Sequence, residues 1–150
     1  MQVIYGDILS SDADVIVHQV NCQGVMGKGL AKQIRDEYPE VFTEYKLFCS
    51  KCNSFDLLGK TQIVRVGFIG FRRYIANLFA QEYYGSGRKC YTDYDALRKC
   101  LTTVNSSFAG KTVAIPYKLG CGLAGGNWDI VSKIIEETLT DCRVKIYRIK

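Results

Sequence analysis

The sequence twice runs from an apolar, β-branched segment through a glycine-rich loop into an amphipathic helix, over residues 15–38 and again over residues 112–140. The first loop, residues 21–29, reads Asn-Cys-Gln-Gly-Val-Met-Gly-Lys-Gly, and the second, residues 117–126, reads Tyr-Lys-Leu-Gly-Cys-Gly-Leu-Ala-Gly-Gly. Strands that alternate with helices build a parallel sheet covered by helices. A loop that opens a helix presents free backbone N–H groups and the positive end of the helix dipole. The two units therefore predict an α/β fold with anion sites at the carboxyl ends of two strands.

The remaining segments continue the same alternation. Short apolar or alternating runs predict strands, and apolar positions three and four residues apart predict helices. The predicted strands cover residues 3–5, 15–20, 61–66, 74–79, 112–116 and 144–149, and the predicted helices cover residues 30–38, 39–48, 94–108 and 127–139. We expect one domain over residues 1–150, a three-layer α/β/α fold with a central mixed, mostly parallel sheet of about six strands.

Several local signals place the ends of these elements. Pro39 is suited to the first turn of a helix. Thr92 or Asp93, and Asn127, are residue types that cap helices. Residues 53–56 and residues 81–92 are predicted to be loops, and Gly67 and Gly70 mark a turn between two strands.

The charge balance is mildly basic, with 20 Lys and Arg residues, 15 Asp and Glu residues and a formal net charge of +5. Either a few cations serve an anionic small molecule, or this is ordinary solubilising charge. The longest basic run is Arg72-Arg73, so there is no strong nucleic-acid signal. A loose aromatic and basic set in the long loop keeps a nucleic-acid binder as an alternative: Tyr83, Tyr84, Arg88, Lys89 and Tyr91.

No apolar stretch reaches the roughly 18 residues that a membrane-spanning helix needs, so we expect no such helix. The first residues lack the features of a signal peptide, so we expect a cytoplasmic protein. Seven cysteines, an odd number, favour free thiols over a complete disulfide set. Cys49 and Cys52 have metal-like spacing, but no second pair follows, and the single histidine, His18, is far away in sequence. Zinc usually takes four nitrogen or sulfur ligands, so we expect no metal and no cofactor.

Neither glycine-rich loop matches a phosphate-binding motif in its usual context. The P-loop pattern is absent, and the segment that begins at Gly27 does not complete the dinucleotide fingerprint. Residues 120–125 do fit Gly-x-Gly-x-x-Gly, but too little chain follows for the acidic ribose ligand of such folds. Each loop alone is also consistent with a turn that requires a positive φ angle.

One ordered set of segments extends over nearly the whole chain: Gly6-Asp7-Ile8, then Val15-Ile16-Val17-His18-Gln19-Val20-Asn21, Gly27-Lys28-Gly29-Leu30-Ala31, Ile115-Pro116 followed by Gly120-Cys121-Gly122-Leu123, and Trp128 at a helix start. Taken together, these segments resemble the macrodomain family, the ADP-ribose-binding module. The resemblance is closest to the branch of ADP-ribose-1''-phosphate phosphatases and terminal ADP-ribose glycohydrolases. It implies that the ligand is ADP-ribose or a derivative.

The resemblance also implies roles for individual residues. Asp7 accepts a hydrogen bond from the adenine amino group beside the backbone of Ile8, and Tyr147 packs near adenine. Asn21 bonds the hydroxyls of the distal ribose. The loop residues that line the distal ribose or wrap the diphosphate are Gly27, Lys28, Gly29, Gly120, Cys121, Gly122 and Leu123. Two alternatives stay open, namely that Asp7 caps a turn and that Tyr147 packs in the core.

The hydrolase patterns of the family are incomplete in this chain. Ala124 stands where one branch has an aspartate, Ala31 stands where another has an acidic residue, and residues 77–81 supply no clear match to a nucleophilic lysine. His18 matches the His-x-x-Asn-Cys segment of the phosphatase branch and is the catalytic candidate, as an acid or base near neutral pH. The alternative is that His18 is a buried, hydrogen-bonded residue of the strand.

Two loop thiols, Cys22 and Cys121, are further candidates, because a helix N-terminus lowers the pKa of a thiol. No basic partner lies at motif distance from either thiol. Lys118, within the second loop, lies outside the hydrolase motifs and is assigned only electrostatic help. The sequence thus predicts a protein that binds ADP-ribose or a derivative, with hydrolysis at the distal ribose of the phosphatase type. The alternative function is a non-catalytic reader of ADP-ribosylated protein or nucleic acid.

Overall fold

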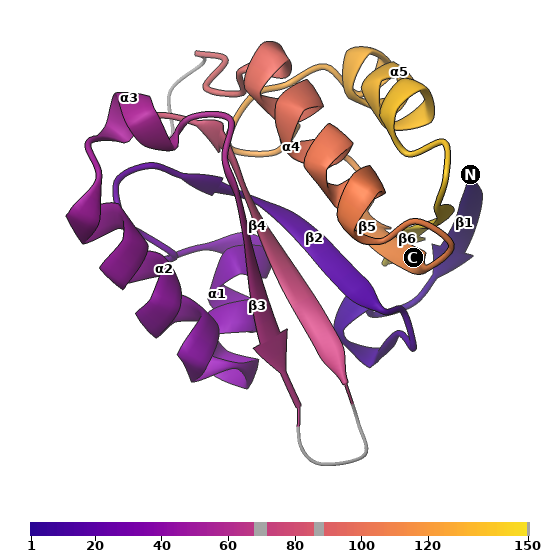
Figure 1. Ribbon diagram of the computed structural model, residues 1–150. Helices are drawn as coiled ribbons and strands as arrows, with labels where there is room; N and C mark the ends of the chain where they lie inside the picture. Colours follow the sequence, from indigo (N-terminus) through magenta and orange to yellow (C-terminus); the bar gives the residue numbers. More distant parts are fainter. Residues whose placement is uncertain (68–71, 86–88, 150) are drawn as a thin grey trace.

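The protein is built on one six-stranded sheet, seen in a computed structural model that describes residues 1–67, 72–85 and 89–149 (Figure 1). The strand order is β1-β6-β5-β2-β4-β3. Every neighbouring pair is parallel except β3 and β4, which are antiparallel. The strands are β1 (Gln2–Tyr5), β2 (Val15–Asn21), β3 (Thr61–Val66), β4 (Arg73–Gln81), β5 (Thr112–Pro116) and β6 (Arg143–Arg148). The mixed, mostly parallel sheet expected from the sequence is confirmed.

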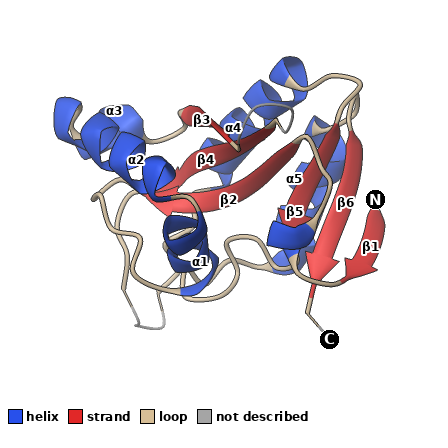
Figure 2. Cartoon of the chain, turned by 90° about the horizontal axis from the view of Figure 1, so that it is seen from below, coloured by secondary structure: helices blue, strands red, loops and turns tan. Residues whose placement is uncertain are grey.

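Helices cover both faces of this sheet and complete the three layers (Figures 1 and 2). One layer holds α1 (Gly29–Glu37), α2 (Pro39–Lys51) and α3 (Ser54–Leu57), and the other holds α4 (Tyr94–Ser107) and α5 (Trp128–Thr138). The loop predicted at residues 53–56 is wrong, because the Asn53 side chain accepts a hydrogen bond from the Asp56 N–H and starts α3. The predicted turn glycine Gly70 and the loop residue Arg88 lie outside the described residues.

The helices differ in how their first turns are capped, and this difference matters for the site. Asp93 and Asn127 cap α4 and α5 by accepting hydrogen bonds from backbone N–H groups, and Pro39 occupies the first turn of α2. By contrast, the N-cap residues of α1 and α2, Lys28 and Tyr38, make no side-chain capping bond. The first N–H groups of α1 therefore have no side-chain cap and face the carboxyl ends of the strands.

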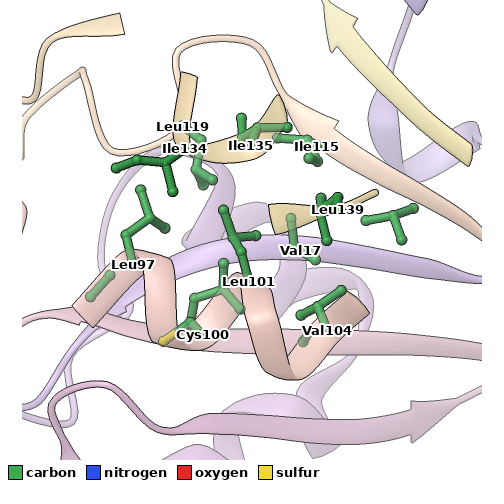
Figure 3. Packing of buried hydrophobic residues seen from close by; sticks show 14 of the residues in the cluster. Val17, Leu97, Cys100, Leu101, Val104, Ile115, Leu119, Ile134, Ile135 and Leu139 are labelled. Carbon is green, nitrogen blue, oxygen red and sulfur yellow. The ribbon is translucent and has the colours of Figure 1, made fainter. Parts of the chain in front are cut away.

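The central strand β2 is buried on both faces, as its continuous apolar run predicts. Val15 and Val17 pack into the core under α4 and α5, where Figure 3 labels Val17. Ile16 and Val20 pack into the core under the other three helices. The β2 residues from 15 to 18 are each at most 2% exposed. Burial on both faces fixes the position of β2, and with it the loop that follows.

His18 is the polar exception within the buried part of β2. Its Nε2 bonds the Oδ1 of Asn77 on β4, and Asn77 Nδ2 donates to Gln62 Oε1 on β3 at 3.0 Å. Gln62 Nε2 then donates to the backbone carbonyl of Glu44 on α2 at 3.0 Å. Burial lowers the pKa of His18 to about 4 although the bond to Asn77 opposes this shift. The imidazole is therefore neutral at neutral pH and connects three strands to a helix.

This network predicts that the protein loses stability in acid. His18 must gain a proton on unfolding wherever the pH lies below its unfolded pKa of about 6.5 and above its folded pKa of about 4. We expect the free energy of unfolding to fall by about 3 kcal/mol as the pH drops through this window. Urea denaturation at several pH values measures this fall. The His18→Gln variant, which cannot titrate there, should show a flatter profile, and equal slopes for both proteins would contradict the assignment.

Candidate functional site

Among the cavities along the edge of the sheet where the five parallel strands have their carboxyl ends, two adjoin the start of α1. The first, here called the Asn21 cavity, has a volume of about 350 Å³, and the second, the Asp7 cavity, has a volume of about 300 Å³. They lie on either side of the N-terminus of α1, because Lys28 and Ala31 line the first, while Leu30 and Gln33 line the second. Ligands of open α/β sheets bind at this edge. The uncapped start of α1 suits an anionic group that joins the two cavities.

The first glycine-rich loop is held in place by Asn21, at the end of β2. The register of β2 against β4 shifts between Val20 and Asn21. The Asn21 Oδ1 accepts hydrogen bonds from the N–H of Gln23 at 2.9 Å and from the Tyr45 hydroxyl at 2.8 Å. Its Nδ2 donates to the carbonyl oxygen of Val25 at 2.8 Å. Asn21 thus lines the cavity, and most hydrogen bonds of its side chain hold the loop in place. One hydrogen of its amide group is left for a ligand.

The second glycine-rich loop is fixed by a chain of side chains that starts on β2. Gln19 Nε2 donates to Gln81 Oε1 and to Thr92 Oγ1, both at 2.9 Å. Thr92 Oγ1 donates to the carbonyl of Gly120 at 2.6 Å. Gly120 has a φ of +70°, and a Cβ there would lie 2.7 Å from Gln19 Oε1. A side chain at this position would be strained at this φ and would crowd the Gln19 and Thr92 side chains that hold the loop.

The Asp7 cavity brings together three residues predicted from the sequence, since Asp7, Ile8 and Tyr147 all line it. Asp7 Oδ1 accepts a hydrogen bond from the N–H of Leu9 at 3.0 Å and caps a short 3-10 turn. The turn-capping role is therefore present, and the exposed carboxylate keeps a further oxygen for a ligand. Arg148 lines the same cavity and lies 4.0 Å from the centre of the Tyr117 ring, which stiffens this wall.

The predicted loop residues divide into two groups. Gly27, Lys28 and Leu123 line the Asn21 cavity. The other loop residues named from the sequence belong to the same loops without lining either cavity: Gly29, Gly120, Cys121 and Gly122. His18 also lines neither cavity, because it points into the sheet network. Its catalytic role stays a prediction.

The two loop thiols are not activated in this structure. Burial raises the pKa of Cys22 to about 12 and that of Cys121 to about 11. Both thiols are therefore protonated at neutral pH, opposite to what a nucleophilic or metal-binding cysteine requires. Among the described residues, no group of three His, Cys, Asp or Glu side chains is arranged to hold a metal ion. Within the same residues, no helix is long and apolar enough to cross a membrane.

Three contributors to the Asn21 cavity were not found by sequence reasoning. Gln19 and Gln81 line the cavity and bond to each other, and Tyr45 supports it from behind with a fully buried ring. Gln19 and Gln81 could have been found as polar residues near the carboxyl ends of β2 and β4. Tyr45 gave no signal, because its spacing marks it equally well as a core residue of α2.

The sheet topology and the cavities at its carboxyl edge define an α/β ligand-binding protein. A family model described as Macro domain matches residues 17–135, which are most of the chain, and the chain belongs to this family. The family expected from the sequence is confirmed.

Individual relatives agree with this assignment. The chain is 32% identical over 146 residues to a DNA ADP-ribosyl glycohydrolase of Mycobacterium tuberculosis, covering 95% of this chain and 40% of that protein. It is 26% identical over 162 residues to an ADP-ribose 1''-phosphate phosphatase of Scheffersomyces stipitis, covering 91% of this chain and 94% of that protein. The solved macrodomain of Mycobacterium tuberculosis DarG superposes with a TM-score of 0.76 at 30% identity, covering 99% of each chain.

The support that Tyr45 gives to Asn21 can be tested directly. Tyr45→Phe removes the hydroxyl that donates to Asn21 and leaves buried acceptors with one partner fewer. We expect a loss of about 1–3 kcal/mol in unfolding free energy and faster amide exchange in residues 22–25. Urea denaturation and hydrogen exchange measure the two effects. Tyr74→Phe, on the α4 side of the sheet, is the matched control, and equal exchange in residues 22–25 of both variants would contradict the role.

Proposed function

We propose that this macrodomain binds ADP-ribose along the carboxyl edge of its sheet, with adenine in the Asp7 cavity and the distal ribose in the Asn21 cavity. The observation that carries the proposal is the position of the uncapped N-terminus of α1 between the two cavities. A diphosphate is the anionic link between the two ends of ADP-ribose. Backbone N–H groups and the helix dipole at the start of α1 stabilise such an anion.

Each end of the cleft offers groups that suit its half of the ligand. The exposed Asp7 carboxylate accepts from the adenine amino group, and Ile8 and Tyr147 provide apolar surface beside the base. At the other end, Asn21 has an amide hydrogen left for a ribose hydroxyl, and Lys28 is the charged side chain among the described lining residues. This division of polar and apolar groups matches a nucleotide that lies across the edge of the sheet.

A second candidate function is turnover of the bound ligand. It is favoured by the names of two relatives, a DNA ADP-ribosyl glycohydrolase and an ADP-ribose 1''-phosphate phosphatase. ADP-ribose carried on DNA, or ADP-ribose with a distal phosphate, would then be the substrate. Ala31 and Ala124 both line the Asn21 cavity, at the positions where the resemblance implies carboxylates in other branches. Because neither alanine can orient a water or take a proton, binding is the first function we propose.

Calorimetric titration with ADP-ribose tests the first function. Asp7→Ala removes the acceptor for the adenine amino group, and we expect the affinity to fall about tenfold or more. Asp12→Ala is the matched control, because the Asp12 side chain is 91% exposed and lines neither cavity. Equal affinities for the two variants would contradict the placement of adenine. No binding at millimolar ADP-ribose would overturn the proposed function.

Turnover is tested with ADP-ribose-1''-phosphate and with ADP-ribosylated single-stranded DNA as substrates. Because His18 lies outside both cavities, we expect His18→Gln to retain the kcat of the wild type for any substrate that is turned over. Release of phosphate or of ADP-ribose is the readout. If His18→Gln loses turnover but still binds ADP-ribose with wild-type affinity, the catalytic role predicted from the sequence is supported instead.

A further inference from the structure

A group of exposed aromatic side chains borders the Asn21 cavity, and the binding mode proposed above assigns it no role. Tyr83 and Tyr84 are 54% and 55% exposed, and Tyr84 lines the cavity. The backbone that carries them is anchored, since Gln81 Nε2 donates to the Tyr83 carbonyl at 2.9 Å. The Glu82 carbonyl accepts from the N–H of Cys22 at 3.0 Å. The two rings are therefore presented to solvent from a fixed position beside the first glycine-rich loop.

A second segment brings a lysine and another tyrosine to the same place. The Tyr91 hydroxyl packs so closely on Gly85 that no Cβ would fit there. The Tyr91 N–H donates to the carbonyl of Ala124, a cavity residue, at 2.7 Å. Lys89 Nζ lies 5.6 Å from the centre of the Tyr91 ring. We call Tyr83, Tyr84, Lys89 and Tyr91 the tyrosine rim.

The charges around the tyrosine rim are suited to an anionic partner. Lys28 lines the cavity, and both Lys28 and Lys89 are exposed. The neighbouring acid, Glu82, accepts a hydrogen bond from the Ser54 hydroxyl at 2.7 Å and is turned toward α3. Flat rings next to cations bind single-stranded nucleic acid, because each base offers a face for stacking and each nucleotide carries a phosphate.

We propose that the tyrosine rim binds the nucleotide that neighbours an ADP-ribosylated base in single-stranded DNA. The proposal rests on the binding of ADP-ribose in the cleft, because it is the bound ADP-ribose that brings the attached strand to the mouth of the Asn21 cavity. Tyr83 stacks on the neighbouring base, and Lys89 faces a phosphate of the strand. Stacking of this kind tolerates any base, so recognition by the rim does not depend on sequence.

The experiment compares affinities for four probes: free ADP-ribose, a short single-stranded DNA with ADP-ribose on one base, the same DNA unmodified, and an ADP-ribosylated peptide. We expect the wild type to bind the modified DNA about tenfold more tightly than free ADP-ribose. Tyr83→Ala should remove this advantage and leave binding of free ADP-ribose unchanged, since Tyr83 lines neither cavity. Tyr83→Phe, which keeps the ring, should restore it.

Charge is tested in the same titrations by varying the salt concentration. Lys89→Ala should lower the slope of log affinity against log salt by about 0.7 for the modified DNA. Lys111→Ala is the matched control, because this exposed lysine lies next to the amino end of β5, at the opposite edge of the sheet. An equal change in slope for both variants would overturn the role of Lys89.

The outcomes separate the two proposals. If free ADP-ribose binds and the modified DNA binds no more tightly, the rim proposal is overturned and the proposed function stands. If the ADP-ribosylated peptide gains as much affinity as the DNA, and Tyr83→Ala removes that gain, the rim serves a protein and the proposal is wrong. If no probe that carries ADP-ribose binds, the proposed function fails and the rim proposal fails with it.

Discussion

The burial of β2 on both faces is the constraint from which the site follows. Polar side chains on a strand buried in this way are stabilised by hydrogen bonds to partners inside the protein. His18 forms a hydrogen bond with Asn77 on β4, and Asn21 accepts one from Tyr45 on α2. Both bonds tie β2 to its neighbours, and the second also sets the path of the glycine-rich loop that follows. The same packing that makes the core therefore fixes one wall of the ligand cleft.

The elements that local chemistry determines could be predicted from the sequence. Asp93 and Asn127 cap helices by bonding backbone N–H groups two or three residues further along the chain. The glycine content of the two loops alone indicates backbone turns. The short helix α3 was missed because the same residue type, Asn53, suits both a loop and a helix cap. A helix of four residues is too short to show the spacing of apolar residues that would distinguish a helix from a loop.

The support behind the site could not be predicted, because it depends on contacts between distant parts of the chain. Gln19 meets Thr92 and Gln81, and Tyr45 meets Asn21, through the order of the strands and the placement of α2. Side chains alternate between the two faces along a strand, which places Gln19 and His18 on opposite faces of β2. This alternation does not extend to Asn21, since the register shifts after Val20 and the Asn21 side chain contacts Tyr45. A one-residue irregularity of this kind leaves no mark in the sequence pattern.

The charge pattern of the Asn21 cavity bears on which form of ADP-ribose it accepts. Ala31 and Ala124 line this cavity together with Lys28. A carboxylate at either alanine position would repel a second anion near the distal ribose, and in a partly enclosed cavity this repulsion is weakly screened. Lysine and two alanines favour an added negative group instead. In the binding mode proposed above, we therefore expect a distal ribose that carries a phosphate, or that continues into a phosphate-bearing strand, to be held more tightly than one joined to a cationic side chain.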